Sequence, residues 1–182
     1  MILDIVKKLY PFDYSICGKG NDDAIKIFKK YLDFKIHNFA SGKSLNGWTI
    51  PHSWYLKKGL ISGQNNKIVF NAKNKNFGVP TLSKSFKGRV LLKNLKKKIF
   101  YSKYKNFTPF NWTNLYRKNF IDWGFCMNKK EFNELKESYY FIDLITKTKK
   151  SKMKVLEYTL KGKNKETIII NAHNCHPYQA ND

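Results

Sequence analysis

Arginine is nearly absent from this strongly basic chain. Only Arg89 and Arg117 are arginines, although lysine and arginine together number 35 and the formal net charge is +22. Surfaces that recognise phosphates and bases usually use arginine, whose planar guanidinium donates two parallel hydrogen bonds. The lysines are spread along the chain, and an AT-rich genome favours lysine codons. We therefore keep a basic nucleic-acid-binding protein as an alternative and do not expect this to be the main function.

The chain also lacks a long apolar run, a secretory leader and a cysteine framework. No apolar stretch approaches the roughly 20 residues that a membrane-spanning helix needs. The opening "MILDIVKKLYPFDY" has no basic region followed by a long apolar stretch and a cleavage site. Cys17, Cys126 and Cys175 lie far apart, as is typical of a reducing compartment. We expect a soluble cytoplasmic protein with no membrane partner, and the sequence does not specify its oligomeric state.

The first 45 residues favour two helices followed by a short strand. Apolar residues at helical spacing predict a first helix that ends before Pro11. A second helix is expected to begin after an N-cap at Asn21 or Asp22. Its apolar stripe would consist of Ile25, Phe28 and Leu32. The segment "FKIHNF" then predicts a strand, before the turn-rich "ASGKSLNG".

Between about residues 46 and 128 the pattern changes to short strands and many aromatic residues. "GWTIP", "KGLIS" and "KIVF" predict strands, and "SGQNNK" predicts a hairpin loop between the last two. The stretch from Leu91 to Ile99 predicts a helix. All four tryptophans lie in this region: Trp48, Trp54, Trp112 and Trp123. They either fill a small core or form a binding surface for a sugar or protein partner, so we interpret 46–128 as a β-rich inserted domain.

The remaining segment, residues 129–182, is expected to return to the first domain. Asn128 and Glu131 form a plausible capping box for a short helix. "YYFIDLIT" and "KVLEYTL", joined by a lysine-rich turn, predict an antiparallel pair of strands. In "ETIIINAH" three isoleucines are consecutive, which is typical of a strand buried on both faces. These patterns predict an α/β fold, with helices on the two sides of a central sheet.

Four residues whose side chains can bind a metal ion follow the isoleucines: His173, Cys175, His176 and Asp182. Ligand sites of open α/β sheets lie beyond the carboxyl ends of the strands. Imidazole suits zinc, and an aspartate can bridge two ions. The alternative is a pair of histidines in ordinary structural hydrogen bonds. Cys175 could be a nucleophile beside a base, although a packed cysteine fits better because no orienting carboxylate is evident. His37 and His52 are interpreted as ordinary polar positions.

The C-terminal segment "IIINAHNCHPYQAND" resembles the signature of a bacterial family of aminopeptidase-like proteins of polysaccharide-biosynthesis gene clusters. "GWTIPHSW", "LYRKNFIDWGFC" and "KVLEYTLKG" match other family segments in the same order, and "YPFDYSICGKGNDDAIKIF" resembles a shortened form of the N-terminal segment. The resemblance covers essentially the whole chain. The C-terminal motif and "WGFC" are its most specific parts.

The resemblance implies the N-terminal part of a zinc-aminopeptidase-like α/β sandwich with a mixed sheet, interrupted by a small β-rich domain. Its domains would be 1–45, the insertion 46–128, and 129–182. It implies that His173 and Asp182 are zinc ligands in a two-ion site, and that Cys175 and His176 orient the loop or support the ligands. Intact relatives would act on a peptide or aminoacyl substrate.

Several family features have no counterpart here. Gly47 stands where the family has an aspartate, and the segment after Cys17 is shortened. After Asp182 the chain lacks the family's catalytic glutamate and remaining metal ligands. Glu131, Glu134 and Glu137 follow one helix face and do not replace them. The sequence therefore predicts a fragment of a zinc-dependent aminopeptidase-like hydrolase, inactive alone and with no catalytic residue of its own. A non-catalytic module that uses the aromatic-rich insertion is the alternative.

Overall fold

The protein is described by a computed structural model, which covers residues 2–14, 17–104, 106–111 and 122–174. Two compact units divide the chain: Met1–Ser53 with Lys149–Asp182, and Trp54–Thr148. Compared with the predicted insertion at 46–128, the second unit both begins and ends later in the sequence. Within the described residues, no helix has the length and apolar character needed to cross a membrane.

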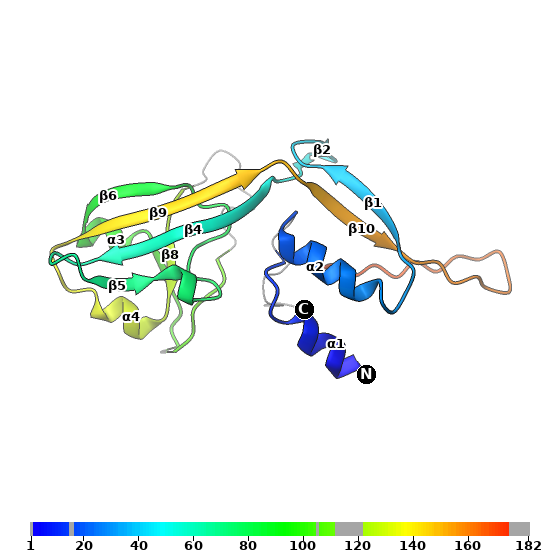
Figure 1. Cartoon of the computed structure of the whole chain (residues 1–182), viewed down its shortest axis with the longest axis horizontal. Helices are drawn as coiled ribbons and strands as arrows, with labels where there is room; N and C mark the ends of the chain where they lie inside the picture. The colour runs from blue at the N-terminus through cyan, green and yellow to red at the C-terminus, as the bar shows by residue number, and fades with distance from the viewer. Residues whose placement is uncertain (1, 15–16, 105, 112–121, 175–182) are drawn as a thin grey trace. The chain divides into compact units, whose positions relative to one another are not determined.

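The described residues of the first unit form two helices and two small antiparallel sheets (Figure 1). The strand predicted at "FKIHNF" is confirmed as β1, which pairs along its whole length with β10. A second, very short pair follows β1 and contains β2 and β3. The elements are α1 (Ile2–Leu9), α2 (Lys19–Phe28), β1 (Lys35–Ala40), β2 (Ser44–Leu45), β3 (Trp48–Thr49) and β10 (Lys152–Glu157).

Both predicted N-terminal helices form. In the second, the expected N-cap is wrong, and the expected apolar stripe is confirmed only in part, because Phe28 packs against the core cluster of Leu9, Tyr14 and Ala24. Its N-cap is Gly18, with no side-chain hydrogen bond, so α2 begins before Asn21 and Asp22. It ends at Phe28, and Leu32 lies beyond it with 41 % of its surface exposed. Glycine is required at position 20, since an added Cβ would lie 1.9 Å from the carbonyl oxygen of Asp13.

The second unit is organised around an antiparallel sheet of four strands in the order β5-β4-β9-β6 (Figure 1). Strand β9 lies inside this sheet, between β4 and β6. In the described part of this unit, a parallel pair, β7 with β8, and two short α-helices accompany it. The elements are β4 (Ser53–Ser62), β5 (Ile68–Asn71), η1 (Ala72–Asn74), β6 (Phe86–Leu91), α3 (Leu92–Lys96), β7 (Ile99–Tyr101), β8 (Phe125–Met127), α4 (Lys129–Glu134) and β9 (Tyr139–Lys149).

Strict alternation along β9 creates the core of this unit. Tyr140, Ile142 and Leu144 are at most 2 % exposed, whereas Phe141, between the first two, and Ile145, after the last, are each 38 % exposed. Side chains of a strand point alternately to its two faces, so one set contacts the core and the other does not. Trp54 of β4 belongs to this core, and its indole N–H donates to the carbonyl of Ser83 at 3.0 Å. Trp54 is therefore a core residue.

Several local predictions for this region are confirmed. The loop 63–67 joins β4 and β5, which pair as the expected antiparallel hairpin. The capping box of α4 is complete, because Asn128 accepts from the Glu131 N–H at 2.9 Å and Glu131 accepts from the Asn128 N–H at 3.0 Å. The helix expected between Leu91 and Ile99 is the short α3.

The predicted pairing of the last strands is wrong. β9 and β10 follow one another in the sequence, but β9 pairs with β4 and β6 whereas β10 pairs with β1. "ETIIINAH" has no strand structure, and its isoleucines are exposed. A run of apolar residues is buried only when other elements cover both faces, and within the described residues no strand pairs with it. The sheets described are antiparallel apart from the β7–β8 pair, so the expected central mixed sheet is also absent from this part of the chain.

The alternation of β9 predicts unequal effects of two neighbouring truncations. Leu144→Ala removes buried methyl groups and should lower the free energy of unfolding by about 2–5 kcal/mol. Ile145→Ala, on the other face, should cost at most about 1 kcal/mol. Urea denaturation followed by tryptophan fluorescence measures both, because Trp54 lies in the same core. Equal losses would contradict the assignment of faces.

Candidate metal centre

His173 is the one predicted site residue that the structure describes. It lies in a segment, residues 158–174, that contains neither helix nor strand. The preceding Ile168, Ile169 and Ile170 are 89, 86 and 91 % exposed, and His173 is exposed as well. The prediction that His173 projects from the edge of a buried strand is therefore wrong.

The other three predicted site residues, Cys175, His176 and Asp182, lie outside the described residues. Their roles as metal ligand or loop-orienting residues stay predictions. In the part of the chain that is described, no group of three or more His, Cys, Asp or Glu side chains could hold a metal ion. Protein zinc sites use three or four such ligands. The described residues alone therefore do not fit the zinc site that the resemblance implies.

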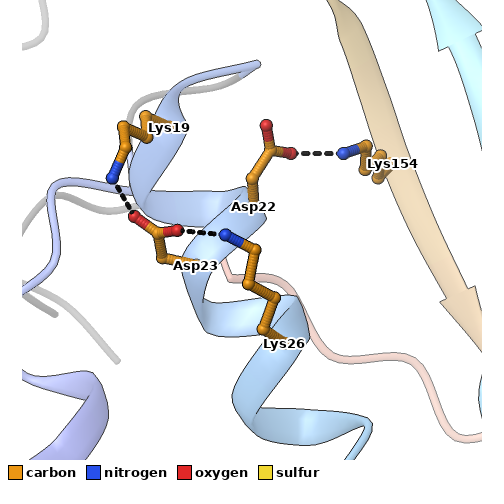
Figure 2. Close-up of polar contacts among 5 residues, drawn as sticks. All are labelled: Lys19, Asp22, Asp23, Lys26 and Lys154. Carbon is orange, nitrogen blue, oxygen red and sulfur yellow. Dashed lines mark hydrogen bonds and ion pairs between the residues drawn. The ribbon is translucent and has the colours of Figure 1, made fainter.

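Two adjacent carboxylates at the start of α2 are held by lysines (Figure 2). Asp22 forms an ion pair with Lys154 of β10, which links the helix to the β1–β10 sheet. Asp23 accepts from Lys19 at 2.6 Å and from Lys26 at 2.9 Å. These hydrogen bonds hold the pKa of Asp23 below its usual range. Both carboxylates have cationic partners. Asp22 connects α2 to β10, whereas both partners of Asp23 belong to α2 itself.

A histidine and a glutamate meet on the β1–β10 pair, which the sequence interpretation did not foresee. The Nε2 atom of His37 lies 2.5 Å from a carboxylate oxygen of Glu157, and Lys35 is 3.9 Å from the same oxygen. The hydrogen bond from His37, followed by the charge of Lys35, lowers the pKa of Glu157. The sequence predicted both strands but not their pairing with each other, and it is this antiparallel register that places Lys35 opposite Glu157.

His52 also has a specific partner. Its Nδ1 atom lies 2.8 Å from the hydroxyl of Ser41, and that hydroxyl accepts from the backbone N–H of Ser151 at 2.9 Å. A serine beside a histidine can act as a nucleophile when a carboxylate orients the imidazole. Among the described residues no carboxylate contacts His52. The arrangement closes the end of the β1–β10 pair, where Ser41 and Ser151 also exchange a backbone hydrogen bond.

Burial suppresses the nucleophilic reactivity of the two described cysteines. Burial, assisted by the negative charge of Asp22, raises the pKa of the Cys17 thiol to about 11. Burial raises the pKa of the Cys126 thiol to about 12. Both are therefore protonated at neutral pH, and thiolate is the form that attacks electrophiles and binds zinc. Cys126, part of the "WGFC" motif, packs in β8 beside the core residues Phe125 and Met127.

We expect Cys17 and Cys126 to resist iodoacetamide at pH 8 in the native chain and to react fully in urea. Their raised pKa values leave very little thiolate at that pH, and burial limits access. Peptide mapping by mass spectrometry distinguishes each cysteine. Rapid native alkylation of Cys126 would contradict its burial in β8.

Replacing His37 should raise the pKa of Glu157. In the wild type the lowered pKa means that the charged carboxylate is favoured in the folded state. Its contribution to stability is therefore present above the unfolded pKa and is lost as pH falls through the folded value. His37→Leu should move the Glu157 pKa toward the usual range of a glutamate, about 4.3. Carbon-detected NMR titration measures it, and His52→Leu, which alters the Ser41 contact instead, should leave it unchanged.

Comparison with known proteins shows a relation along essentially the full chain. A Clostridium acetobutylicum protein described as "Putative polysaccharide biosynthesis protein with aminopeptidase-like domain" is 26 % identical over 187 residues, covering 100 % of this chain and 41 % of its own length. A crystal structure described as a "putative peptidase" from the same organism matches 98 % of this chain and 42 % of its own, with a TM-score of 0.80 and 24 % identity.

The fold of this chain is thus similar to the corresponding part of that solved structure, and the chain spans less than half the length of either relative. Residues 3–182 match the family described as Domain of unknown function (DUF4910). This match includes both compact units and the C-terminal segment that carries His173. The chain belongs to the DUF4910 family.

Proposed function

We propose that this chain is part of a zinc-dependent aminopeptidase-like hydrolase and that it does not hydrolyse peptides by itself. The observation that carries this proposal is the family match across residues 3–182, combined with a relative that contains an aminopeptidase-like domain. The chain corresponds to 41 % of that relative. The complete activity would then depend on residues that this chain does not supply.

The small number of ligands in the predicted metal site also supports the proposal that this chain does not hydrolyse peptides by itself. His173 and Asp182 would contribute one imidazole and one carboxylate to the metal site. Two ligands hold zinc poorly, because water competes effectively for the remaining positions. The described acidic side chains offer no alternative: Asp22 and Asp23 are held by lysines, and Glu131 belongs to the capping box of α4. We therefore propose that zinc is bound firmly only when further ligands complete the set.

The substrate class follows from the relatives' description. An aminopeptidase-like domain in a protein of polysaccharide biosynthesis suggests an amide or aminoacyl bond, on a peptide or on an amino-acid-substituted precursor. We propose that class and no particular compound.

We expect the purified 182-residue chain to release no p-nitroaniline from a panel of aminoacyl p-nitroanilides, with or without added zinc. We also expect it to retain no stoichiometric zinc after dialysis, as measured by inductively coupled plasma mass spectrometry. The physical reason is the incomplete ligand set and the missing general base.

The decisive control is His173→Ala. Under the proposal this variant matches the wild type in both measurements. Turnover by the wild type that is abolished by a chelator and by His173→Ala would show that the chain is active alone. Zinc retained equally by both would instead show a site elsewhere in the chain.

A further inference from the structure

The outward face of the four-stranded sheet in the second unit carries an unusual mixture of aromatic and cationic side chains. The register between β6 and β9 fixes which residues share this face, because paired residues in antiparallel strands lie on the same side. Their core-facing neighbours Tyr140, Ile142 and Leu144 are buried. We define the outer patch as Lys58 of β4, Lys87, Arg89 and Leu91 of β6, and Tyr139, Phe141 and Asp143 of β9.

The centre of the outer patch is an ordered stack of flat groups. The guanidinium of Arg89 lies over the Tyr139 ring, 3.9 Å from its centroid. Tyr139 in turn contacts Phe141 edge to face, with ring centroids 5.6 Å apart. Phe141 remains 38 % exposed and Leu91 is 55 % exposed. Arginine stacked in this way keeps its hydrogen-bonding edge available for a carboxylate. The stack therefore presents an apolar surface beside a fixed cation.

The charged side chains of the four strands are predominantly positive. Together β4, β5, β6 and β9 contain six lysines and arginines and one acidic residue, Asp143. Asp143 is paired with Lys58 at 2.5 Å. Within the described part of the chain, Lys87 and Arg89 have no carboxylate partner and both are exposed. The shift in burial alternation at Lys57 and Lys58 of β4 exposes both lysines. An anionic ligand is the complement of such a face.

We propose that the outer patch binds an acidic polysaccharide. The apolar faces of sugar rings can pack on Phe141 and the neighbouring Tyr139, while uronate carboxylates pair with Arg89 and Lys87. A sheet surface is long and gently twisted, which suits a linear chain of sugars. The choice of a saccharide rests on the proposed function, since the relative is a protein of polysaccharide biosynthesis. The outer patch would hold the polymer while the hydrolytic part of the longer protein acts.

The test uses the whole 182-residue chain and isothermal titration calorimetry with an oligogalacturonate of defined length. We expect binding that weakens as salt is raised, and no binding of a neutral galactan of equal length. Phe141→Ala should weaken binding roughly tenfold through lost stacking. Arg89→Gln should weaken it roughly tenfold as well, and Arg89→Lys should restore part of the loss because it retains the charge.

Lys130→Gln is the matched control, because it removes one positive charge from the exposed surface of α4, whose Phe132 packs against the core. It should leave the affinity within about twofold. Thermal melts by circular dichroism confirm that each variant keeps its fold.

Three outcomes would overturn the proposal: no binding of the acidic oligomer, equal binding of the neutral one, or equal losses in Lys130→Gln and Phe141→Ala. Tighter binding of oligo(dT), with the same dependence on Phe141 and Arg89, would assign the outer patch to single-stranded nucleic acid instead. These results are independent of the aminoacyl p-nitroanilide assay, so failure of either proposal can be recognised separately.

Discussion

The second unit depends on the two-residue period of β9. This strand pairs on both sides, and alternate residues belong to the core and to the outer patch. Because the period is two, a slip of one residue would place Phe141 and Asp143 in the core and expose Tyr140, Ile142 and Leu144. Tyr140 adds a polar restraint, since its hydroxyl accepts from the backbone N–H groups of Lys136 and Glu137 at 2.8 and 3.0 Å. The register of β9 therefore determines both which residues form the core and which residues form the outer patch.

The ion pair between Lys58 and Asp143 adds an electrostatic contribution to this register. It joins β4 to β9 across neighbouring strands, and the Asp143 side chain is 24 % exposed. The other oxygen, Oδ1, is buried without a hydrogen-bond partner among the described residues. A half-satisfied carboxylate in a sheet costs free energy that a neutral residue would not. The ion pair sets the one acidic residue of the four strands against Lys58, and among the described residues neither Lys87 nor Arg89 has a carboxylate partner of its own.

Sequence patterns predicted the elements whose cause is local. The capping box of α4 needs only Asn128 and Glu131, which lie three residues apart, and the β4–β5 hairpin needs only a short turn-forming loop. The failures concern distant partners. Strand β10 pairs with the distant β1 although it follows β9 in sequence, and within the described residues no strand pairs with the isoleucines of "ETIIINAH". Of the predicted site residues, only His173 is described. Its surroundings depend on whether other elements cover the three isoleucines that precede it.

Those isoleucines carry an energetic consequence. Full burial of an isoleucine side chain is worth about 1.5–3 kcal/mol, so the nearly complete exposure of Ile168, Ile169 and Ile170 represents roughly 5–9 kcal/mol of unused hydrophobic free energy. That amount is comparable with the total stability of an ordinary domain. A surface that covered the three side chains would therefore gain a large hydrophobic contribution to the free energy of binding from one short segment. It would also fix the position of the imidazole three residues further along.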